Sequence, residues 1–396
     1  MSGTSMDGID AALVRLTYVK SQPSVRLLAF HTYPFAPELH RRLTTIVANQ
    51  KGSLQEISHL NFALGEAFAG AAQAICRRGK ISPSRGQVVG SHGQTVWHQP
   101  RPVAWGEESI RSTLQLGEPS IIAERLGITT VADFRPADMA AGGHGAPLSA
   151  WFHYLLFRKH PRPVAVHNLG GISNLTYIPR GARPRDVIAF DTGPGNMLID
   201  GLIQSATRGR QSHDVGGRLA ARGRIDLKVV ARLLRHPFIV ARPPKTTGRE
   251  EFGTSFVRQV RRLAGRRAAL DDLVATATAF TASAIAENYR RFILTRGPRR
   301  GEVPDGGLEE IVFCGGGSHN KTLLKMIGRE LGGIRLSTLD DYGIPVDAAE
   351  AVCFAVLGAQ AITGRPNHLP QATGARREIV LGKIIPGRGF RGIHRV

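Results

Sequence analysis

Two apolar, β-branched segments with glycine clusters, between residues 165 and 200, constrain the fold most. The first reads Ala-Val-His-Asn-Leu-Gly-Gly-Ile-Ser-Asn-Leu-Thr-Tyr-Ile from Ala165, and the second reads Val-Ile-Ala-Phe-Asp-Thr-Gly-Pro-Gly-Asn from Val187. A polar turn joins them, so the pattern predicts a β-hairpin. Glycines in such places let the backbone approach a ligand closely, and consecutive N–H groups in turns bind anions.

Asp191 is placed by this pattern where the second strand ends, beside Thr-Gly-Pro-Gly-Asn. A carboxylate at a strand end next to an anion-binding loop suits a general base or a metal anchor. The alternative is that Asp191 only caps a turn through its own backbone, as Asp before Gly often does.

The composition is that of a soluble α/β protein with many tight turns. The chain has 396 residues, 42% hydrophobic residues, 6% aromatic residues and 46 glycines, enough for two domains that share a cleft. No apolar run reaches the ~18 residues of a membrane span, and no signal peptide is evident, which favours a cytoplasmic protein. The three cysteines are far apart, which argues against both a disulfide framework and zinc.

A formal charge of +21 raises the question of a polyanionic partner. Arginines gather at residues 77–85, 258–267 and 290–300. Such clusters can bind phosphate backbones. However, they are not interleaved with aromatic residues and match no nucleic-acid-binding motif. The pattern therefore favours solvated helix surface over a nucleic-acid interface.

The first ten residues form a loop of glycines and hydroxyls with two acids. The N–H groups from Gly3 to Gly8, with the hydroxyls of Thr4 and Ser5, can surround phosphate oxygens, and Asp7 could hold Mg²⁺ or its waters. The lysine of a P-loop is absent. The alternative is a flexible polar N-terminus, but the loop opens directly onto an apolar strand pattern.

Apolar periodicity predicts alternating strands and helices along the rest of the chain. The predicted strands are 9–19, 25–33, 88–89, 112–116, 128–132, 308–313, 334–336 and 379–385. The predicted helices are 38–78, 118–126, 151–157, 273–295, one from about 320, and 346–362, and the segment 200–248 is helical and basic. Residues 90–98 are expected to form a polar loop.

Loops that follow the predicted strands carry further candidate side chains. His92, flanked by glycines, is either a ligand for a hydroxyl-rich molecule or a structural histidine. Asp133 and Arg135 follow a strand and can bind sugar hydroxyls or a carboxylate, unless they form an ion pair with each other. Glu350 has mostly apolar helical neighbours, so we expect a buried acid that is paired or functional. The backbone of residues 315–317 can lie flat against an adenine or ribose, because no Cβ blocks the approach.

Three glycine loops and a strand-end aspartate suit ATP-dependent phosphoryl transfer across an interdomain cleft. The arrangement is that of the actin, hexokinase and Hsp70 superfamily. Eight motifs lie in order along almost the whole chain: Met-Ser-Gly-Thr-Ser-Met-Asp-Gly-Ile-Asp from Met1, Gly-Ser-His-Gly-Gln-Thr from Gly90, Ala-Asp-Phe-Arg from Ala132 with Gly-Gly-His-Gly-Ala-Pro from Gly142, Asn-Leu-Gly-Gly-Ile-Ser-Asn from Asn168, Phe-Asp-Thr-Gly-Pro-Gly-Asn from Phe190, Thr-Gly-Arg-Glu from Thr247, Cys-Gly-Gly-Gly from Cys314, and Tyr-Gly-Ile-Pro from Tyr342 followed by Glu-Ala at Glu350. With these motifs the chain resembles the anhydro-N-acetylmuramic acid kinase family.

The resemblance implies a fold of two RNase H-like domains around an ATP cleft. We expect an N-terminal domain at 1–140, a C-terminal ATPase-like domain at 141–375 and a terminal strand and tail at 376–396. It also implies a reaction in amino-sugar metabolism and peptidoglycan recycling. Water opens the 1,6-anhydro ring of 1,6-anhydro-N-acetylmuramic acid, and O6 takes the γ-phosphoryl group of ATP with the help of Mg²⁺. A homodimer is a further expectation.

The resemblance also assigns roles to individual residues. Asp191 is the base that activates the water. The phosphates are held by Gly3, Thr4, Ser5, Met6, Asp7, Gly8, Ile9 and Asp10, and by the second phosphate loop at Gly170 and Gly171. The adenosine side is Gly315, Gly316 and Gly317. The sugar pocket is lined by His92, Asp133, Arg135 and Glu350, and Asp7 contacts the metal through water.

One departure from the family pattern gives a rival interpretation. Family members carry an apolar strand before Met-Ser-Gly-Thr-Ser, and here the chain starts at that loop. The first strand of the N-terminal domain is then expected to be missing, which leaves buried backbone groups unpaired at ~1–3 kcal/mol each. The alternative to an active kinase is therefore a truncated, inactive and basic relative that binds ATP or polyanions without turnover. A different sugar or acetate-type kinase of the superfamily is a second alternative.

Overall fold

Two compact units make up the protein. The computed structural model describes residues 1–3, 6, 8–19, 22–49, 51–265, 267–295 and 307–390, so the predicted phosphate ligands Thr4, Ser5 and Asp7 lie outside the described residues. Unit 1 comprises Met1–Leu156 and Ala348–Val396, and unit 2 comprises Phe157–Asp347. This division differs from boundaries after residues 140 and 375, because helix α14 (Ala349–Ala361) returns to pack on strands of unit 1.

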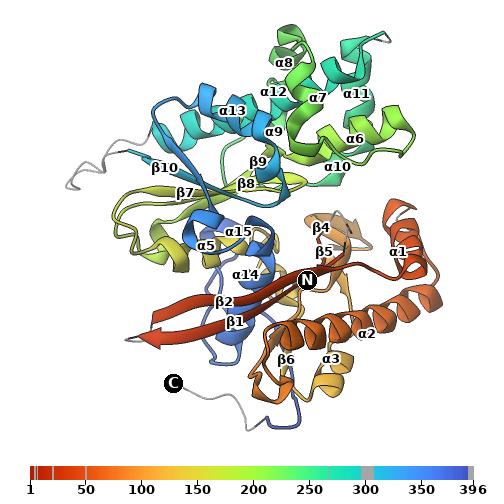
Figure 1. The fold of residues 1–396 in the computed structure, drawn as a ribbon, viewed down its shortest axis with the longest axis vertical. Coiled ribbons are helices and arrows are strands. Elements are labelled where there is room, and N and C mark those ends of the chain that lie inside the picture. Colours follow the sequence, from red (N-terminus) through yellow and green to blue (C-terminus); the bar gives the residue numbers. More distant parts are fainter. Residues whose placement is uncertain are drawn as a thin grey trace. The chain divides into compact units, whose positions relative to one another are not determined.

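Unit 2 is built on a five-stranded sheet in the order β11-β10-β7-β8-β9 (Figure 1). Strands β7, β8 and β9 form an antiparallel meander, and β10 and β11 run parallel to β7. This is the strand order of an RNase H-like domain, and the α/β fold class is confirmed. The strands of this sheet are β7 Val164–Leu169, β8 Ile172–Ile178, β9 Ile188–Pro194, β10 Glu310–Cys314 and β11 Arg335–Thr338.

The prediction of one hairpin between residues 165 and 200 is wrong in one respect. The first apolar run is not a single strand, because Gly170 and Gly171 turn the chain between β7 and β8. The second turn, around residues 179–187, then joins β8 to β9. Both glycine clusters therefore lie at the same end of the meander, since Leu169 pairs with Ser173 and Ile172 with Pro194.

Helix α12 (Leu270–Tyr289) is central to the packing of unit 2. It is rich in alanine and threonine and is buried along most of its length, as expected for a helix without a polar face. It contacts β9 and the helices α6, α7, α8 and α13. The other helices of this unit are α6 Asn196–Thr207, α7 Arg218–Arg222, α8 Leu227–Leu233, α9 Pro237–Val240, α10 Arg249–Phe252, α11 Thr254–Ala264 and α13 Lys321–Glu330.

The described residues of unit 1 form three small sheets: the hairpin β1-β2, the hairpin β4-β5 and the three-stranded sheet β12-β6-β3. Helix α2 packs on β1, β2, β5 and α3, and its apolar face joins a core with Met6 and Ile9. The strands are β1 Ile9–Val19, β2 Gln22–Tyr33, β3 Val89–Gly90, β4 Gln94–Trp105, β5 Glu108–Leu116, β6 Thr130–Ala132 and β12 Lys383–Ile385. The remaining helices are α1 Pro37–Asn49, α2 Leu54–Arg78, α3 Pro119–Leu126, α4 Phe134–Ala140, α5 Ser149–Phe157 and α15 Pro370–Thr373.

Several element predictions in unit 1 are wrong. The helix expected at 38–78 is two helices, because Ser53 starts a new one by accepting a hydrogen bond from Glu56 N at 3.1 Å. Residues 94–98 belong to a strand instead of a loop, since they pair with β5 across a hairpin. Helix α4 was not predicted, and the last strand covers only Lys383–Ile385.

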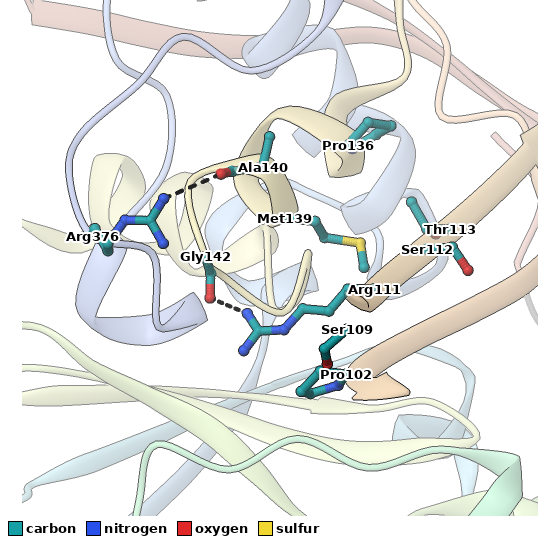
Figure 2. Close-up of a pocket in the computed structure, with 10 residues that line it drawn as sticks. All are labelled: Pro102, Ser109, Arg111, Ser112, Thr113, Pro136, Met139, Ala140, Gly142 and Arg376. Carbon is teal, nitrogen blue, oxygen red and sulfur yellow. Dashed lines mark hydrogen bonds between the residues drawn. The ribbon is translucent and has the colours of Figure 1, made fainter. Parts of the chain in front are cut away.

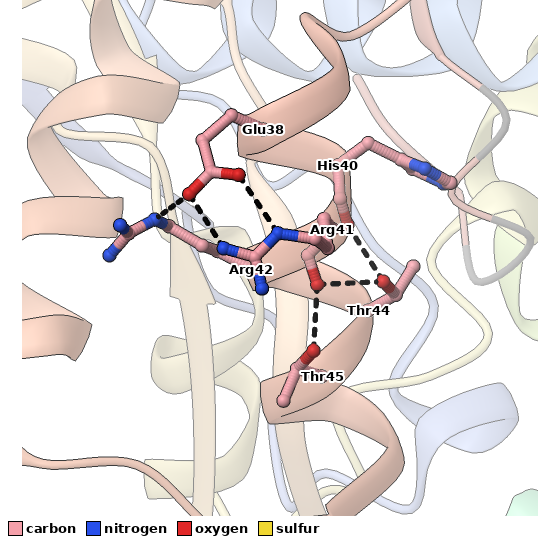
Figure 3. A network of polar contacts seen from close by, with 6 residues as sticks. All are labelled: Glu38, His40, Arg41, Arg42, Thr44 and Thr45. Carbon is pink, nitrogen blue, oxygen red and sulfur yellow. Dashed lines mark hydrogen bonds and ion pairs between the residues drawn. The ribbon is translucent and has the colours of Figure 1, made fainter.

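The basic side chains that the structure describes lie largely on exposed helix faces. On α1, Glu38 pairs with Arg41 at 2.7 Å and with Arg42 at 2.6 Å (Figure 3). These hydrogen bonds lower the pKa of Glu38 to about 2. On α11, Phe256, Val257 and Val260 are buried while the arginines face solvent. Among the described helices, none has both the length and the apolar character to cross a membrane.

Candidate active site

Asp191 is a buried carboxylate near the end of β9, with 6% of its surface exposed. Its Oδ2 accepts hydrogen bonds from Thr246 Oγ1 at 2.8 Å and from Thr247 N at 2.9 Å. Its backbone N donates to Lys245 O at 3.1 Å. Within the described residues, Oδ1 accepts no hydrogen bond. The carboxylate is thus fixed by a distant segment instead of capping its own turn, and one oxygen is left to act.

Burial raises the pKa of Asp191 to about 6. The Thr247 N–H and the Thr246 hydroxyl oppose this shift, Glu250 adds to it, and Lys245 opposes it. A carboxylate with such a pKa is mostly ionised at neutral pH and is still basic enough to accept a proton. These properties suit a general base.

Lys245 holds the segment that fixes Asp191. Its Nζ is buried and donates to Phe238 O at 2.9 Å and Ile239 O at 3.0 Å, at the end of α9. The ammonium also lies 4.8 Å from the ring centroid of Phe238, and burial lowers the pKa of Lys245 to about 8. The sequence signal was the rigid Pro-Pro-Lys-Thr-Thr-Gly turn, but nothing in it pointed to Asp191.

A buried polar network lies behind Asp191 in the sheet. His167 Nε2 contacts Ser173 Oγ at 2.7 Å, and Ser173 Oγ contacts Thr192 Oγ1 at 2.8 Å. His167 Nδ1 contacts the Tyr289 hydroxyl at 3.0 Å. Burial lowers the pKa of His167 to about 3, so the ring is neutral. The network ties β7, β8 and β9 to α12 and so limits movement of the strand that carries Asp191.

The Gly170–Gly171 turn is held by the start of α6. Asn196 N donates to Gly170 O at 2.9 Å, and Gly195 N and Met197 N donate to Gly171 O at 2.9 and 3.1 Å. A Cβ on Gly195 would lie 2.2 Å from Gly170 O, so glycine is required there by packing. The structure therefore brings the predicted second phosphate loop directly against the Gly-Pro-Gly-Asn loop after Asp191.

The three glycines of the predicted adenosine loop differ in how much space a Cβ atom would have. Gly315 has φ +79°, and its Cβ would lie 2.4 Å from Asn168 Oδ1. A Cβ on Gly317 would lie 2.7 Å from Leu169 Cβ. Around Gly316, no described atom comes within 4 Å of a Cβ. Packing in the protein therefore explains Gly315 and Gly317 but leaves Gly316 unexplained.

The structure brings together His92 and Arg135 in unit 1. Arg135 Nε donates to His92 Nε2 at 3.0 Å, and His92 Nδ1 contacts Gly93 O at 3.0 Å. Burial, and then the Arg135 charge, hold the pKa of His92 well below its usual range, so the ring is neutral. Arg135 also donates from Nη1 to Gly145 O at 2.6 Å.

The alternative of an ion pair between Asp133 and Arg135 is wrong. Asp133 pairs instead with Lys383 Nζ at 2.8 Å, across the pairing of β6 with β12. Lys383 gave no signal in the sequence. Full burial of Glu350 is not found, because the residue lies in the first turn of α14 with its surface exposed. Desolvation by the surrounding protein nevertheless raises the pKa of its carboxyl. The positive charge of Arg135 lowers this pKa, and the negative charge of Asp10 raises it.

Asp138 fixes the loop that positions Arg135, and the sequence analysis assigned it no role. It is fully buried, and its Oδ1 accepts a hydrogen bond from Thr373 Oγ1 at 2.6 Å. Its Oδ2 accepts one from Gly145 N at 2.7 Å. Because Gly145 O in turn accepts from Arg135, the Asp138 carboxylate fixes the loop that orients the Arg135 guanidinium.

Hydrogen bonds join the described residues of the first phosphate loop. Met6 N donates to Gly3 O at 3.2 Å, and Ser2 Oγ donates to Gly8 O at 2.9 Å. The side chains of Met6 and Ile9 are buried in the core, so only their backbone can serve a ligand. Asp10 Oδ1 accepts a hydrogen bond from Thr32 at 2.6 Å. In the part of the chain that the structure describes, no three His, Cys, Asp or Glu side chains are grouped to bind a metal ion.

Comparisons with known proteins give one consistent result. A sequence model of the family described as anhydro-N-acetylmuramic acid kinase matches residues 1–387. The chain is 44% identical over 386 residues to "Anhydro-N-acetylmuramic acid kinase" of Caldanaerobacter subterraneus subsp. tengcongensis, covering 97% of this chain and 95% of that protein. It is 38% identical to the protein of the same name from Bacillus cereus strain Q1, covering 97% of each.

Solved structures show only a weak likeness. A ROK hexokinase from Thermus thermophilus has 15% identity and a TM-score of 0.32 over 87% of this chain and 97% of that one. A ROK family glucokinase from Streptomyces griseus, solved with glucose and AMPPNP, has 14% identity and a TM-score of 0.33 over 88% of this chain and 100% of that one.

Proposed function

Because the chain belongs to the anhydro-N-acetylmuramic acid kinase family and is a kinase of that family, we propose that it opens and phosphorylates 1,6-anhydro-N-acetylmuramic acid. Water adds to C1, the C1–O6 bond breaks, and O6 takes the γ-phosphoryl group of ATP. The products are N-acetylmuramic acid 6-phosphate and ADP. We further propose that the enzyme acts in the cytoplasm, where ATP is available, and that it forms a homodimer.

The observation that carries this proposal is the state of Asp191. The base must take a proton from water as its oxygen attacks C1, and Asp191 has one carboxylate oxygen fixed by two hydrogen bonds and one without a described partner. Its pKa of about 6 keeps that oxygen ionised at neutral pH. Asp191 Oδ1 is therefore the atom that receives the proton, while Thr246 and Thr247 are positioning residues.

The cluster of unit 1 is proposed to bind the sugar. His92 is neutral, and its one ring proton lies on Nδ1, against Gly93 O, because Nε2 accepts from Arg135. The Arg135 guanidinium and the carboxylates of Asp133 and Glu350 can then bind hydroxyl, acetamido or carboxylate groups of the substrate. Arg135 is the best placed of these, because Gly145 O and His92 both fix it.

Each of the two predicted phosphate loops, residues 3–10 of unit 1 and residues 170–171 of unit 2, is proposed to bind phosphate oxygens of ATP. Mg²⁺ held at this site would neutralise charge that develops during transfer. The residues present fit such an ion. The negative charge of Asp10 raises the pKa of Glu350, so a cation beside the two carboxylates would reduce their repulsion. Mg²⁺ prefers one or two carboxylates together with phosphate oxygens.

Gly316→Ala tests the adenosine side. Since no described atom lies within 4 Å of the new Cβ, the free energy of unfolding is expected to change by less than ~0.5 kcal/mol. A nucleotide lying flat on this loop would meet the methyl group, so KM for ATP is expected to rise roughly tenfold, from a loss of ~1.4 kcal/mol. The matched control is Gly332→Ala, which has equally open surroundings in the same unit. An unchanged KM for ATP in Gly316→Ala would remove this glycine from the nucleotide site.

The rate is expected to fall as the pH drops below about 6. Only ionised Asp191 can accept a proton, and its pKa is raised to about 6, so kcat/KM should decrease about tenfold per pH unit below that value. Initial rates from about pH 5 to about pH 8, with the folded state checked by circular dichroism, measure this profile. A rate that stays constant across this range would contradict the role of Asp191.

Mass spectrometry of the product tests the reaction itself. The proposal predicts a sugar product heavier than the anhydro sugar by one water and one phosphoryl group. A product that gained only the phosphoryl group would mean phosphorylation without ring opening. Recovery of unchanged sugar from folded protein with ATP and Mg²⁺ would contradict the proposal and favour a non-catalytic relative.

A further inference from the structure

Unit 1 contains a cavity of about 620 Å³ for which the proposed reaction assigns no ligand (Figure 2). The walls come from the β4-β5 hairpin, helix α4, Gly142 and Arg376. These segments belong to three stretches of the chain that are far apart in sequence, and all lie within unit 1. The cavity is therefore a feature of the fold of this unit alone.

Two guanidinium groups meet at one side of this cavity. Arg111 Nη1 donates to Gly142 O and, at 3.3 Å, to Gly143 O. Arg376 Nη2 donates to Ala140 O at 3.5 Å, and its Nη1 lies 2.7 Å from where a Cβ of Gly142 would stand. Figure 2 shows the two side chains reaching toward Gly142 from different elements. Gly142 thus leaves room for both cations at one place.

This pair of positive charges has no compensating anion among the residues described. The cavity lining contains no carboxylate, and neither arginine forms an ion pair with a described residue. Asp138 lies close to Gly143, but it is fully buried and already accepts hydrogen bonds from Thr373 and Gly145. Burial lowers the pKa of the neighbouring His144, and Arg111 lowers it further, so the ring is neutral and adds no charge to the site.

The rest of the lining suits a small molecule with a polar and an apolar part. Ser112 Oγ accepts the indole N–H of Trp97 at 3.1 Å, so its own proton remains to be donated. Pro102, Pro136 and Met139 supply an apolar wall. Hydrogen bonds from guanidinium to an oxyanion are among the stronger ones in proteins, because both partners are charged.

We propose that this cavity binds a small oxyanion, carried as a carboxylate or a phosphate group, between Arg111 and Arg376. The backbone carbonyls of residues 140, 142 and 143 hold the two guanidiniums in place before the ligand arrives, which reduces the entropy lost on binding. None of the residues that line the cavity is among those proposed to bind the sugar or ATP, and the inference does not depend on the proposed function.

Isothermal titration calorimetry of the full chain tests the site, with inorganic phosphate as one probe and succinate as the other. Arg376→Gln and Arg111→Gln are each expected to weaken binding of at least one probe about tenfold, because each removes a charged donor. Arg388→Gln is the matched control, since Arg388 is an exposed arginine of the same unit that pairs with Glu124. Phosphate binding at other places on the protein is the same in all variants, so the test compares the affinity of each variant with that of the wild type.

Loss with phosphate alone assigns a phosphate group to the site, and loss with succinate alone assigns a carboxylate. Thermal unfolding shows whether Arg111→Gln is folded, because Arg111 also binds the loop at 142–143. If it is not, the exposed Arg376 gives the test by itself. Equal binding of both probes to the wild type and Arg376→Gln, or no binding of either probe to the wild type, would overturn the proposal.

Discussion

Replacing Asp191 with asparagine is expected to lower kcat roughly 10²–10⁴-fold, the usual contribution of a general base. The amide oxygen of asparagine can still accept the hydrogen bonds from Thr246 and Thr247, so the geometry of the site is retained. The amide cannot accept the proton of the attacking water. The rate of ADP release at saturating sugar and ATP measures the effect.

The same variant is expected to be at least as stable as the wild type at neutral pH. The folded-state pKa of Asp191 is raised from 3.8 to about 6. The ionised side chain therefore costs about 3 kcal/mol of stability above that pH, and the cost disappears as the pH falls through both pKa values. Asparagine carries no charge and avoids this cost. Thermal unfolding at pH 7 gives the comparison.

Asp271→Asn is the control for Asp191→Asn. It removes a carboxylate of the same unit that pairs with Arg222 on the surface. We expect wild-type kcat in this variant. Activity within a few-fold of the wild type in Asp191→Asn itself, with the fold retained, would show that another group takes the proton.

Replacing Asp138 with alanine is expected to lower the free energy of unfolding by about 3 kcal/mol. The change leaves the hydroxyl of Thr373 and the N–H of Gly145 buried without their acceptor, at ~1–3 kcal/mol for each group. It also leaves His368 without the carboxylate 3.5 Å away. Chemical denaturation monitored by tryptophan fluorescence measures the loss.

Asp138→Ala is also expected to raise KM for the sugar, because the Gly145 loop that orients Arg135 loses its anchor. Thr373→Val removes a single hydrogen bond to Asp138 and should show a smaller loss of stability. Glu124→Ala, which removes an exposed ion pair in the same unit, is the control and should stay within ~0.5 kcal/mol of the wild type. Equal unfolding free energies for Asp138→Ala and Glu124→Ala would contradict the anchoring role.

The sequence predicted Asp191 but not the residues that hydrogen-bond to it. Asp191 was found because a strand-end carboxylate beside glycines is a local pattern. The groups that fix it, Thr246 and Thr247, lie 55 and 56 residues further along the chain, and no local pattern connects them to Asp191. The same holds for Asp138, whose hydrogen bond to Thr373 spans 235 residues.

Errors in the predicted elements have local physical causes. The glycines at 170–171 were interpreted as a ligand loop within one strand, but they also form the turn between two strands. Glu350 was expected to be buried from its apolar helical neighbours, but its place in the first turn of α14 leaves it exposed. In both cases the pattern identified the segment, and tertiary packing decided its conformation.

The most direct test of coupled bridge opening and phosphorylation is ADP release from ATP and Mg²⁺ with two sugars, the 1,6-anhydro sugar and N-acetylmuramic acid, which has no 1,6-anhydro bridge. Rapid, sugar-dependent ADP release is expected with the anhydro sugar and little above background with N-acetylmuramic acid, because the oxygen that is phosphorylated is the O6 that departs as the C1–O6 bond breaks. Equal rates with both sugars, or no dependence on either sugar in folded protein, would contradict it.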